Sequence, residues 1–237
     1  MDAYFLPDHV HVCRTDDGVV FLDLKCERYF GLGDEETSAL SGFICEWPVA
    51  GYSSGSTGIV DPREVLKTLL TRGLVTRDRV NTRAPRLSPL ERTDAIPFRG
   101  AIHDPPQITV SHVARFLLSC ATASALLRWR SLERIVRRVQ QRKFRRSREA
   151  AVLSQSELVE LVRVFRRLTP LLFTASGACL FDSLALVEFL AKYRVYPVWA
   201  IGLHTRPFGA HSWVQAGGLV LNETLAEVED YTPILAV

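Results

Sequence analysis

A proline-dense stretch near the middle of the chain is the feature that most constrains its fold. The segment 81–106 contains five prolines and few apolar runs. Proline has no backbone N–H and fixes its φ angle, so this density fits an extended connection rather than a packed helix or strand. Because 237 residues are enough for two domains, we predict domains at 1–80 and 107–237, joined by a linker at 81–106.

Charge and composition distinguish the two predicted domains and limit the class of protein. Residues 1–80 carry 8 basic and 13 acidic side chains, whereas residues 81–237 carry 21 basic and 13 acidic ones. With 47% hydrophobic and 23% charged residues, the composition is that of a globular protein. No uninterrupted apolar run approaches the roughly 18 to 20 residues of a membrane helix, and the N-terminus does not resemble a signal peptide. We therefore expect a cytoplasmic protein with no membrane span.

The cysteines are dispersed along the chain and include no C-x-x-C pair. They are Cys13, Cys26, Cys45, Cys120 and Cys179. An odd, scattered set without an export signal favours free thiols over disulfides or a zinc site. His9 and His11 share one face of a predicted strand but have no third ligand nearby, so we predict no metal site.

Short strand patterns followed by helix patterns fill the N-terminal domain. The strands are predicted at 9–14, 19–24 and 29–32. A helix is predicted at 34–47, and a second one follows Asp61 and Pro62, which supply an N-cap and a first-turn proline. This order predicts an α+β fold with a three-stranded antiparallel sheet. An edge strand of that sheet could accept an extended peptide, although a stabilising subdomain without a ligand fits the pattern equally well.

A strongly basic segment occupies 128–148, with ten Lys or Arg residues and the single acidic residue Glu133. Its apolar residues recur at helical spacing and are Trp129, Leu132, Ile135, Val136, Val139 and Phe144. This pattern predicts one amphipathic helix with a cationic face. Such a face could bind nucleic acid, attract an acidic peptide or simply be solvated. No aromatic platform, zinc finger or helix-turn-helix accompanies it, so we do not predict nucleic acid as a partner.

Cys179 is predicted to lie in the first turn of a helix at 176–190. At that position the unpaired backbone N–H groups and the positive end of the helix dipole favour the thiolate over the thiol. The same N–H groups can stabilise a developing oxyanion. On position alone, a buried and inert cysteine is the alternative.

A histidine and a carboxylate follow the cysteine on two predicted strands. His211 stands near the start of one strand, and Glu223 ends the next. The order thiol, imidazole, carboxylate is typical of a nucleophile, its base and the group that orients the base. His204 is a weaker candidate base because we expect it in a loop, and we expect His103 and His112 to be structural.

The loop between these strands decides whether the histidine and the carboxylate face the same side of the sheet. A two-residue loop at 217–218 would turn Glu223 to the face opposite His211. A three-residue loop at 216–218 would pair the two directly, and such loops use glycine in the left-handed conformation. We predict the three-residue loop, with Asn222 as the orienting residue otherwise.

These residues carry a resemblance to a known family. Cys179 with its helix, 206–214 (RPFGAHSWV) and the Asn-Glu pair at 222–223 resemble the transglutaminase-like cysteine protease of lasso-peptide biosynthesis, the B protein. The runs 19–24 and 28–32 are similar to the precursor-recognition element of that family, which is related to the peptide chaperone of pyrroloquinoline quinone biosynthesis. The resemblance spans nearly the whole chain and matches the fused form of the protein.

The resemblance implies a small winged-helix-like precursor-recognition domain followed by a transglutaminase/papain-like cysteine protease domain. It implies that Cys179 is the nucleophile, His211 the general base and acid, and Glu223 the orienting carboxylate. The residues implied to bind the leader of a precursor peptide are Phe21, Leu22, Leu24, Tyr29 and Phe30. The family most often has Asp where this chain has Glu223, and often Ala where it has Ser212.

The implied function is that of a leader peptidase, which cuts a ribosomally made precursor between leader and core through a thioester. Its implied partners are the precursor peptide and a separate lasso cyclase of the asparagine-synthetase type. We expect no cofactor, because the chain has no G-x-x-x-x-G-K-[ST] loop, although the family makes ATP-dependent cleavage conceivable. Two alternatives stay open: a transglutaminase-like acyltransferase, and a non-catalytic peptide- or nucleic-acid-binding protein that uses 128–148.

Overall fold

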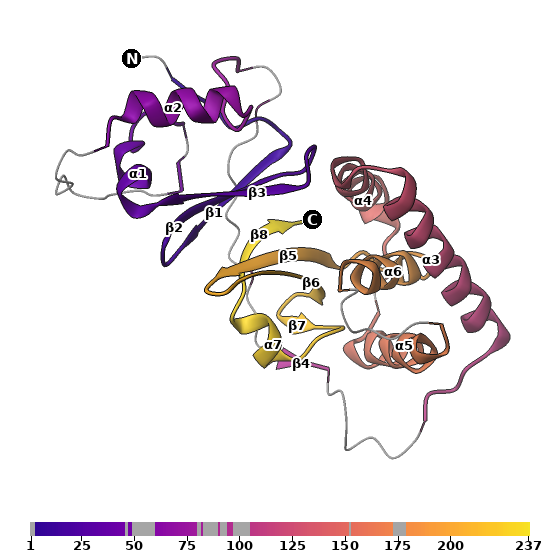
Figure 1. Cartoon of the computed structure of the whole chain (residues 1–237). Helices are drawn as coiled ribbons and strands as arrows, with labels where there is room; N and C mark the ends of the chain where they lie inside the picture. The colour runs from indigo at the N-terminus through magenta and orange to yellow at the C-terminus, as the bar shows by residue number, and fades with distance from the viewer. Residues whose placement is uncertain are drawn as a thin grey trace. The chain divides into compact units, whose positions relative to one another are not determined.

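The computed structural model divides the chain into two compact units (Figure 1). Unit 1 comprises 1–89 with the short segment 204–208, and unit 2 comprises 90–203 and 209–237. The residues that the structure describes are 3–45, 47–48, 60–79, 82, 90, 94–96, 105–151, 153–172 and 179–237. The predicted α+β class is confirmed, because each unit combines helices with a sheet of its own.

The sheet of unit 1 consists of β1 (Val10–Thr15), β2 (Gly18–Asp23) and β3 (Arg28–Gly33) in sequential order. Both pairings are antiparallel, which confirms the predicted three-stranded sheet. The turn into β2 requires glycine, because Gly18 has a φ of 137° and a Cβ there would lie 2.0 Å from the Leu32 carbonyl oxygen.

The helices of unit 1 are α1 (Asp34–Ala39) and α2 (Pro62–Thr71). The predicted helix over 34–47 is wrong in length, because Gly42 adopts a φ of 86° and Ile44 forms a bridge with Tyr4. This long-range backbone pairing holds the chain extended where a helix would have continued. The prediction for α2 is confirmed, since the Asp61 carboxylate accepts a hydrogen bond from the Arg63 N–H at 2.9 Å.

Unit 2 combines five α-helices with a five-stranded sheet among its described residues. The helices are α3 (Val110–Trp129), α4 (Leu132–Arg146), α5 (Gln155–Leu168), α6 (Cys179–Ala191) and α7 (Leu225–Glu229). The strands are β4 (Asp94–Ala95), β5 (Val198–Thr205), β6 (Phe208–Ala216), β7 (Leu219–Val220) and β8 (Thr232–Ala236). The sheet has the order β4-β7-β6-β5-β8.

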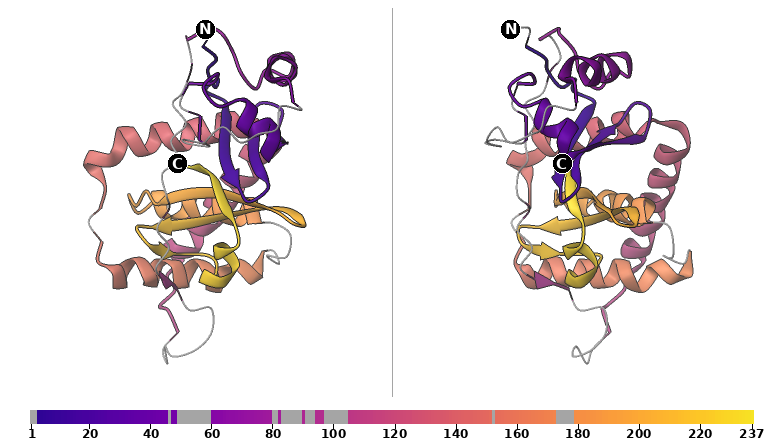
Figure 2. Two further views of the ribbon diagram at one scale, coloured as in Figure 1. Left: turned by 90° about the vertical axis from the view of Figure 1, so that its left-hand side faces the viewer. Right: turned by 60° about the vertical axis from the view of Figure 1, so that its left-hand side comes forward.

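Helix α6 is the central helix of unit 2. Figures 1 and 2 show α3, α5 and α6 together on one side of the sheet. Phe165 of α5 links the three helices, because its ring lies 5.3 Å from that of Phe116 in α3 and 5.5 Å from that of Phe189 in α6. Burial of these rings and of most of α6 fixes the position of its N-terminus, where Cys179 lies.

Two sequence-based expectations change in unit 2. The basic segment is not one amphipathic helix: α3 ends at Trp129, α4 begins at Leu132, and the side chains of Trp129 and Phe144 are exposed. The segment expected to be a linker contributes a strand, because β4 pairs in parallel with β7 and Ile96 is buried.

Helix α3 is longer than the apolar run that the sequence indicated. Of the helices that the structure describes, it alone has the length and composition to cross a membrane, a test that core helices of globular proteins also pass. Phe116, Ser119, Cys120 and Ala123 of α3 are buried in the structure, so this helix contributes one face to the core of unit 2.

Candidate active site

The thiol of Cys179 lies half-buried at the N-terminus of α6. A hydrogen bond from His211 lowers its pKa, and the backbone N–H groups of Ser212 and Leu180 act in the same direction against the opposing effect of burial. The other buried cysteines behave differently, since burial raises the pKa of Cys13 to about 12 and that of Cys120 to about 11. Cys179 is therefore the thiol best prepared to ionise among those inside the protein.

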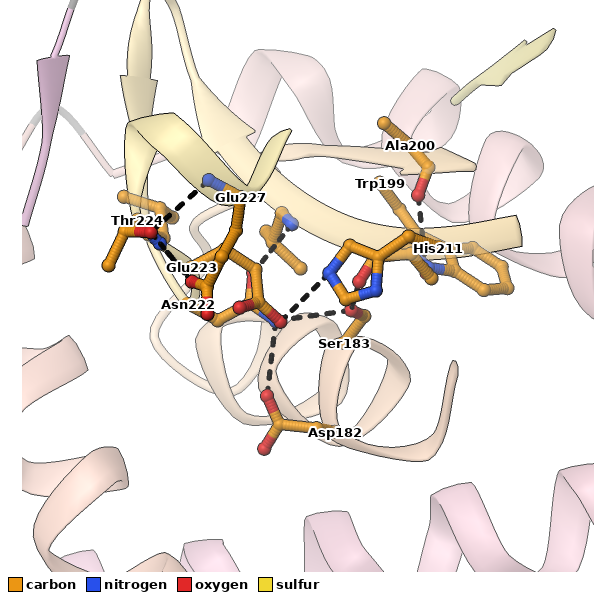
Figure 3. A network of polar contacts seen from close by, with 12 residues as sticks. Asp182, Ser183, Trp199, Ala200, His211, Asn222, Glu223, Thr224 and Glu227 are labelled. Carbon is orange, nitrogen blue, oxygen red and sulfur yellow. Dashed lines mark hydrogen bonds and ion pairs between the residues drawn. The ribbon is translucent and has the colours of Figure 1, made fainter. Parts of the chain in front are cut away.

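The imidazole of His211, on β6, lies between the thiol and a carboxylate. Its Nε2 is 3.1 Å from Oε1 of Glu223 (Figure 3), and its ring centroid is 5.1 Å from that of Tyr231. The contact is an ion pair when the imidazole is protonated. Since Nε2 faces Glu223, Nδ1 is left for Cys179.

The protonated form of His211 is favoured in this position. Burial alone would lower its pKa, but the hydrogen bond with Cys179 and the interactions with Glu223 outweigh burial and raise the pKa to about 9. A depressed thiol pKa beside an elevated imidazole pKa favours a thiolate–imidazolium pair near neutral pH. The structure thus brings together the three residues that the sequence proposed as a triad.

The predicted three-residue hairpin loop is wrong. The ladder pairs Gln215 with Val220 and Ala216 with Leu219, which leaves the two-residue loop 217–218. In a continued ladder that register would turn Glu223 away from His211. Strand β7 instead ends at Val220, and the residues after it leave the ladder. The carboxylate therefore reaches His211 because the strand stops, not because the two residues are paired.

Asn222, the alternative orienting residue, contacts other groups. Its Oδ1 accepts a hydrogen bond from the Val214 N–H at 2.8 Å, and its Nδ2 donates to Asp182 Oδ2 and to Ser183 Oγ, both at 3.1 Å (Figure 3). These hydrogen bonds do not involve His211. They connect the segment that carries Asn222 and Glu223 to β6 and α6.

Two charged residues beneath the site were missed by the sequence analysis. Asp182 is half-buried, and its pKa is raised mainly by desolvation. Burial lowers the pKa of Arg166, on α5, to about 10, while the charges of Asp182 and Glu223 oppose that shift. The spacing of Asp182, three residues after Cys179 on one helix, was an available signal for it. Nothing in the local sequence around Arg166 indicated its role, because its partners are distant along the chain.

The hydroxyl of Ser212, where the family often has alanine, makes two hydrogen bonds. It accepts a hydrogen bond from the Trp199 indole N–H at 2.8 Å and donates one to the Ala200 carbonyl at 3.2 Å. Both partners belong to β5, so the hydroxyl ties β6 to β5 directly beside His211. An alanine at this position would leave the buried indole N–H without this acceptor.

The other histidines that the structure describes lie away from the thiol. His204 lies on β5 rather than in the expected loop, and the imidazole that bonds to Cys179 is that of His211. His112 has the expected structural role, because its Nδ1 accepts a hydrogen bond from the Thr109 N–H at the start of α3. His103 lies outside the described residues. Within the described part of the chain, no group of three or more His, Cys, Asp or Glu residues could hold a metal ion.

The residues predicted to bind a leader peptide fall into two groups. Phe21, Leu22 and Leu24 are buried, so their side chains belong to the interior of the protein. Tyr29 and Phe30 lie on β3 and are partly exposed. Among the described strands, none pairs with the outer edge of β3.

One comparison with known proteins gives a match. The family model described as the transglutaminase-like superfamily matches residues 114–236, more than half of the chain. The matched region contains Cys179, His211 and Glu223. Neither the curated proteins nor the solved structures contain a match.

Proposed function

The chain belongs to the transglutaminase-like superfamily, whose members are typically cysteine-protease-like enzymes, and we propose that it is the leader peptidase of a lasso-peptide pathway. In this proposal it hydrolyses the bond between the leader and the core of a ribosomally made precursor peptide. The observation that supports it best is a thiol with a lowered pKa beside an imidazole that a carboxylate keeps protonated. That combination prepares a nucleophile and a proton donor before the substrate arrives.

The proposed reaction begins when the Cys179 thiolate attacks the scissile carbonyl carbon. The carbonyl oxygen becomes an oxyanion, which the backbone N–H groups at the start of α6 would stabilise. As the C–N bond breaks, the His211 imidazolium gives its proton to the departing amine, and a thioester remains. His211, now neutral, takes a proton from water, which hydrolyses the thioester and regenerates the thiolate–imidazolium pair.

We further propose that unit 1 binds the leader by strand addition at the outer edge of β3. The backbone there can pair with an extended peptide, and Tyr29 and Phe30 offer partly exposed aromatic surface. Holding the leader on the same polypeptide would raise the effective concentration of the scissile bond at the thiol. The released core, with its new amino group, would then pass to a cyclase of the asparagine-synthetase type.

The test is to incubate the protein with a candidate precursor peptide and weigh the products. Two fragments whose masses sum to that of the precursor plus water support the proposal. Cys179→Ala should abolish cleavage while retaining peptide binding, whereas Cys45→Ala, which removes an exposed thiol in unit 1, should cleave normally. Undiminished cleavage by Cys179→Ala would refute the assignment of the nucleophile.

An acyltransferase is the second candidate, because the family match covers transglutaminase-like enzymes in general. In that reaction an amine instead of water would attack the thioester. The same incubation separates the two, since cross-linking removes ammonia from the combined mass and hydrolysis adds water. If neither product forms, a non-catalytic binding role remains.

A further inference from the structure

The segment after β7, residues 221–224, leaves the sheet because two backbone groups exchange their hydrogen-bond partners. In an uninterrupted antiparallel ladder, Val214 and Leu221 would donate to each other's carbonyl groups. Only one of these bonds forms, from the Leu221 N–H to the Val214 carbonyl at 2.8 Å. The Val214 N–H is satisfied by Asn222 Oδ1 instead, and the Leu221 carbonyl accepts a hydrogen bond from Arg166.

We propose that Asn222 is a positioning residue that directs Glu223 toward His211, and that Asp182 and Ser183 hold its side-chain amide in the required orientation. The amide oxygen replaces a backbone carbonyl, so the chain can turn out of the ladder without leaving the buried Val214 N–H unsatisfied. The next residue is Glu223, which then faces the imidazole. This inference rests on the proposed function only for the role of Glu223 in catalysis.

An asparagine suits the position because it has an acceptor and two donors on one short side chain. Both of its donors have acceptors, on Asp182 and Ser183, and the residue is 5% exposed. A flipped amide would bring its NH₂ group against the Val214 N–H and its oxygen against the Asp182 carboxyl group. Aspartate at 222 would lack the donors and would place a second carboxylate beside Asp182.

The hydroxyl of Ser183 extends the connection to the strand that carries His211. It donates its proton to the Ser212 carbonyl at 2.7 Å, which leaves a lone pair to accept from Asn222. Helix α6, strand β6 and the segment after β7 are therefore joined by one buried chain of hydrogen bonds, with His211 and Glu223 beside its members (Figure 3). Such chains restrict relative movement, because each broken bond leaves a buried polar group unpaired.

Several ionisable groups interact with this segment or with a residue that contacts it. They are Arg166 from α5, Cys179 and Asp182 from α6, His211 from β6, Glu227 from α7 and Cys120 from α3. If Glu223 were displaced, the imidazolium would lose the carboxylate that stabilises it, and the thiolate would in turn lose part of its cation. The ionisation of Cys179 therefore reports on the position of Glu223 without any peptide substrate.

The experiment measures the rate of Cys179 alkylation by iodoacetamide against pH, in a Cys26→Ser/Cys45→Ser background that removes the two exposed thiols. Asn222→Ala should slow alkylation at pH 7 by about tenfold, because the thiolate fraction falls tenfold for each unit by which the thiol pKa rises. If the protein is the proposed peptidase, kcat should fall by roughly 10- to 100-fold with little change in KM.

Gln215→Ala is the matched control. Gln215 is also a buried amide on this hairpin, accepting from the Trp213 indole at 2.9 Å and donating to the Gly217 carbonyl at 2.8 Å. It should lower stability while leaving the alkylation profile unchanged. Equal effects of Asn222→Ala and Gln215→Ala on alkylation, or no effect of either, would overturn the proposal.

A second pair of variants covers the case in which Asn222→Ala does not fold. Asp182→Ala removes the acceptor of the amide and should slow alkylation, whereas Asp182→Asn keeps an acceptor oxygen and should restore most of the rate. Equal rates for the two would contradict the role assigned to Asp182. If no peptide is cleaved but the alkylation results hold, the positioning inference stands and the peptidase proposal fails.

Discussion

Replacing Glu223 with glutamine tests the electrostatic basis of the site most directly. The variant keeps the shape of the side chain and removes its charge 3.1 Å from His211 Nε2. The pKa of His211 rises from 6.5 to about 9 in the protein, which corresponds to about 3.4 kcal/mol in favour of the imidazolium. Cys179 and Glu223 produce this shift together against burial. If they contribute similarly, Glu223→Gln should lower the pKa of His211 by at least about 1.25 units, about 1.7 kcal/mol.

NMR titration of histidine side chains measures this shift directly. The chain has six histidines, and the His211 signal is identified by its absence in His211→Asn. Glu229→Gln removes one exposed carboxylate from α7 and should leave the titration unchanged. An unaltered or higher pKa of His211 in Glu223→Gln would refute the assignment of Glu223 as a carboxylate that stabilises the imidazolium.

The same shift has a consequence for stability. Because the pKa of His211 is higher in the folded protein than its ordinary value of 6.5, its protonation stabilises the fold below about pH 6.5 and this contribution is lost as the pH rises through about 9. The difference in unfolding free energy between the wild type and Glu223→Gln should therefore be largest at pH 6 and small above pH 9. A difference that grows with pH would contradict this sign.

Three further outcomes are expected. The peptidase activity should decline on its alkaline side near pH 9, where His211 loses the proton that the leaving amine requires; a constant rate to pH 10.5 would argue against this role. Arg142→Met should cost roughly 3 to 5 kcal/mol in chemical denaturation, because it strands the buried Glu188 carboxylate 2.7 Å from the lost guanidinium, and adding Glu188→Leu should recover most of the loss. Gly202→Ala should destabilise the protein by about 1 to 3 kcal/mol, since its Cβ would lie 2.8 Å from the buried Trp213 ring; unchanged thermal unfolding would contradict that packing.

The elements that could be predicted are those whose signals are local. In unit 1 the first strand alternates, turn residues separate it from the apolar second strand, and α2 begins at an aspartate followed by proline. The length of α1 could not be predicted in the same way, because the chain beyond it pairs with Tyr4, about 40 residues earlier. Strand β4 was missed for a similar reason: a strand of two residues has no periodicity to detect.

In the candidate site, too, the residues with local signals could be predicted and the long-range contacts could not. Cys179 and His211 were found because a cysteine at a helix start and a histidine on a strand are recognisable by position. Glu223 was also proposed, but through a hairpin register that the structure does not have.

The sequence by itself determined the kinds of element, the order of thiol, imidazole and carboxylate, and the family to which they belong. Only the tertiary structure decided how the carboxylate reaches the imidazole. That contact depends on an asparagine side chain taking the place of a backbone carbonyl and on hydrogen-bond partners from α5 and α6. Such partners are distant along the chain. A polar group needs a hydrogen-bond partner when it is buried, and a local sequence pattern does not show which groups will be buried.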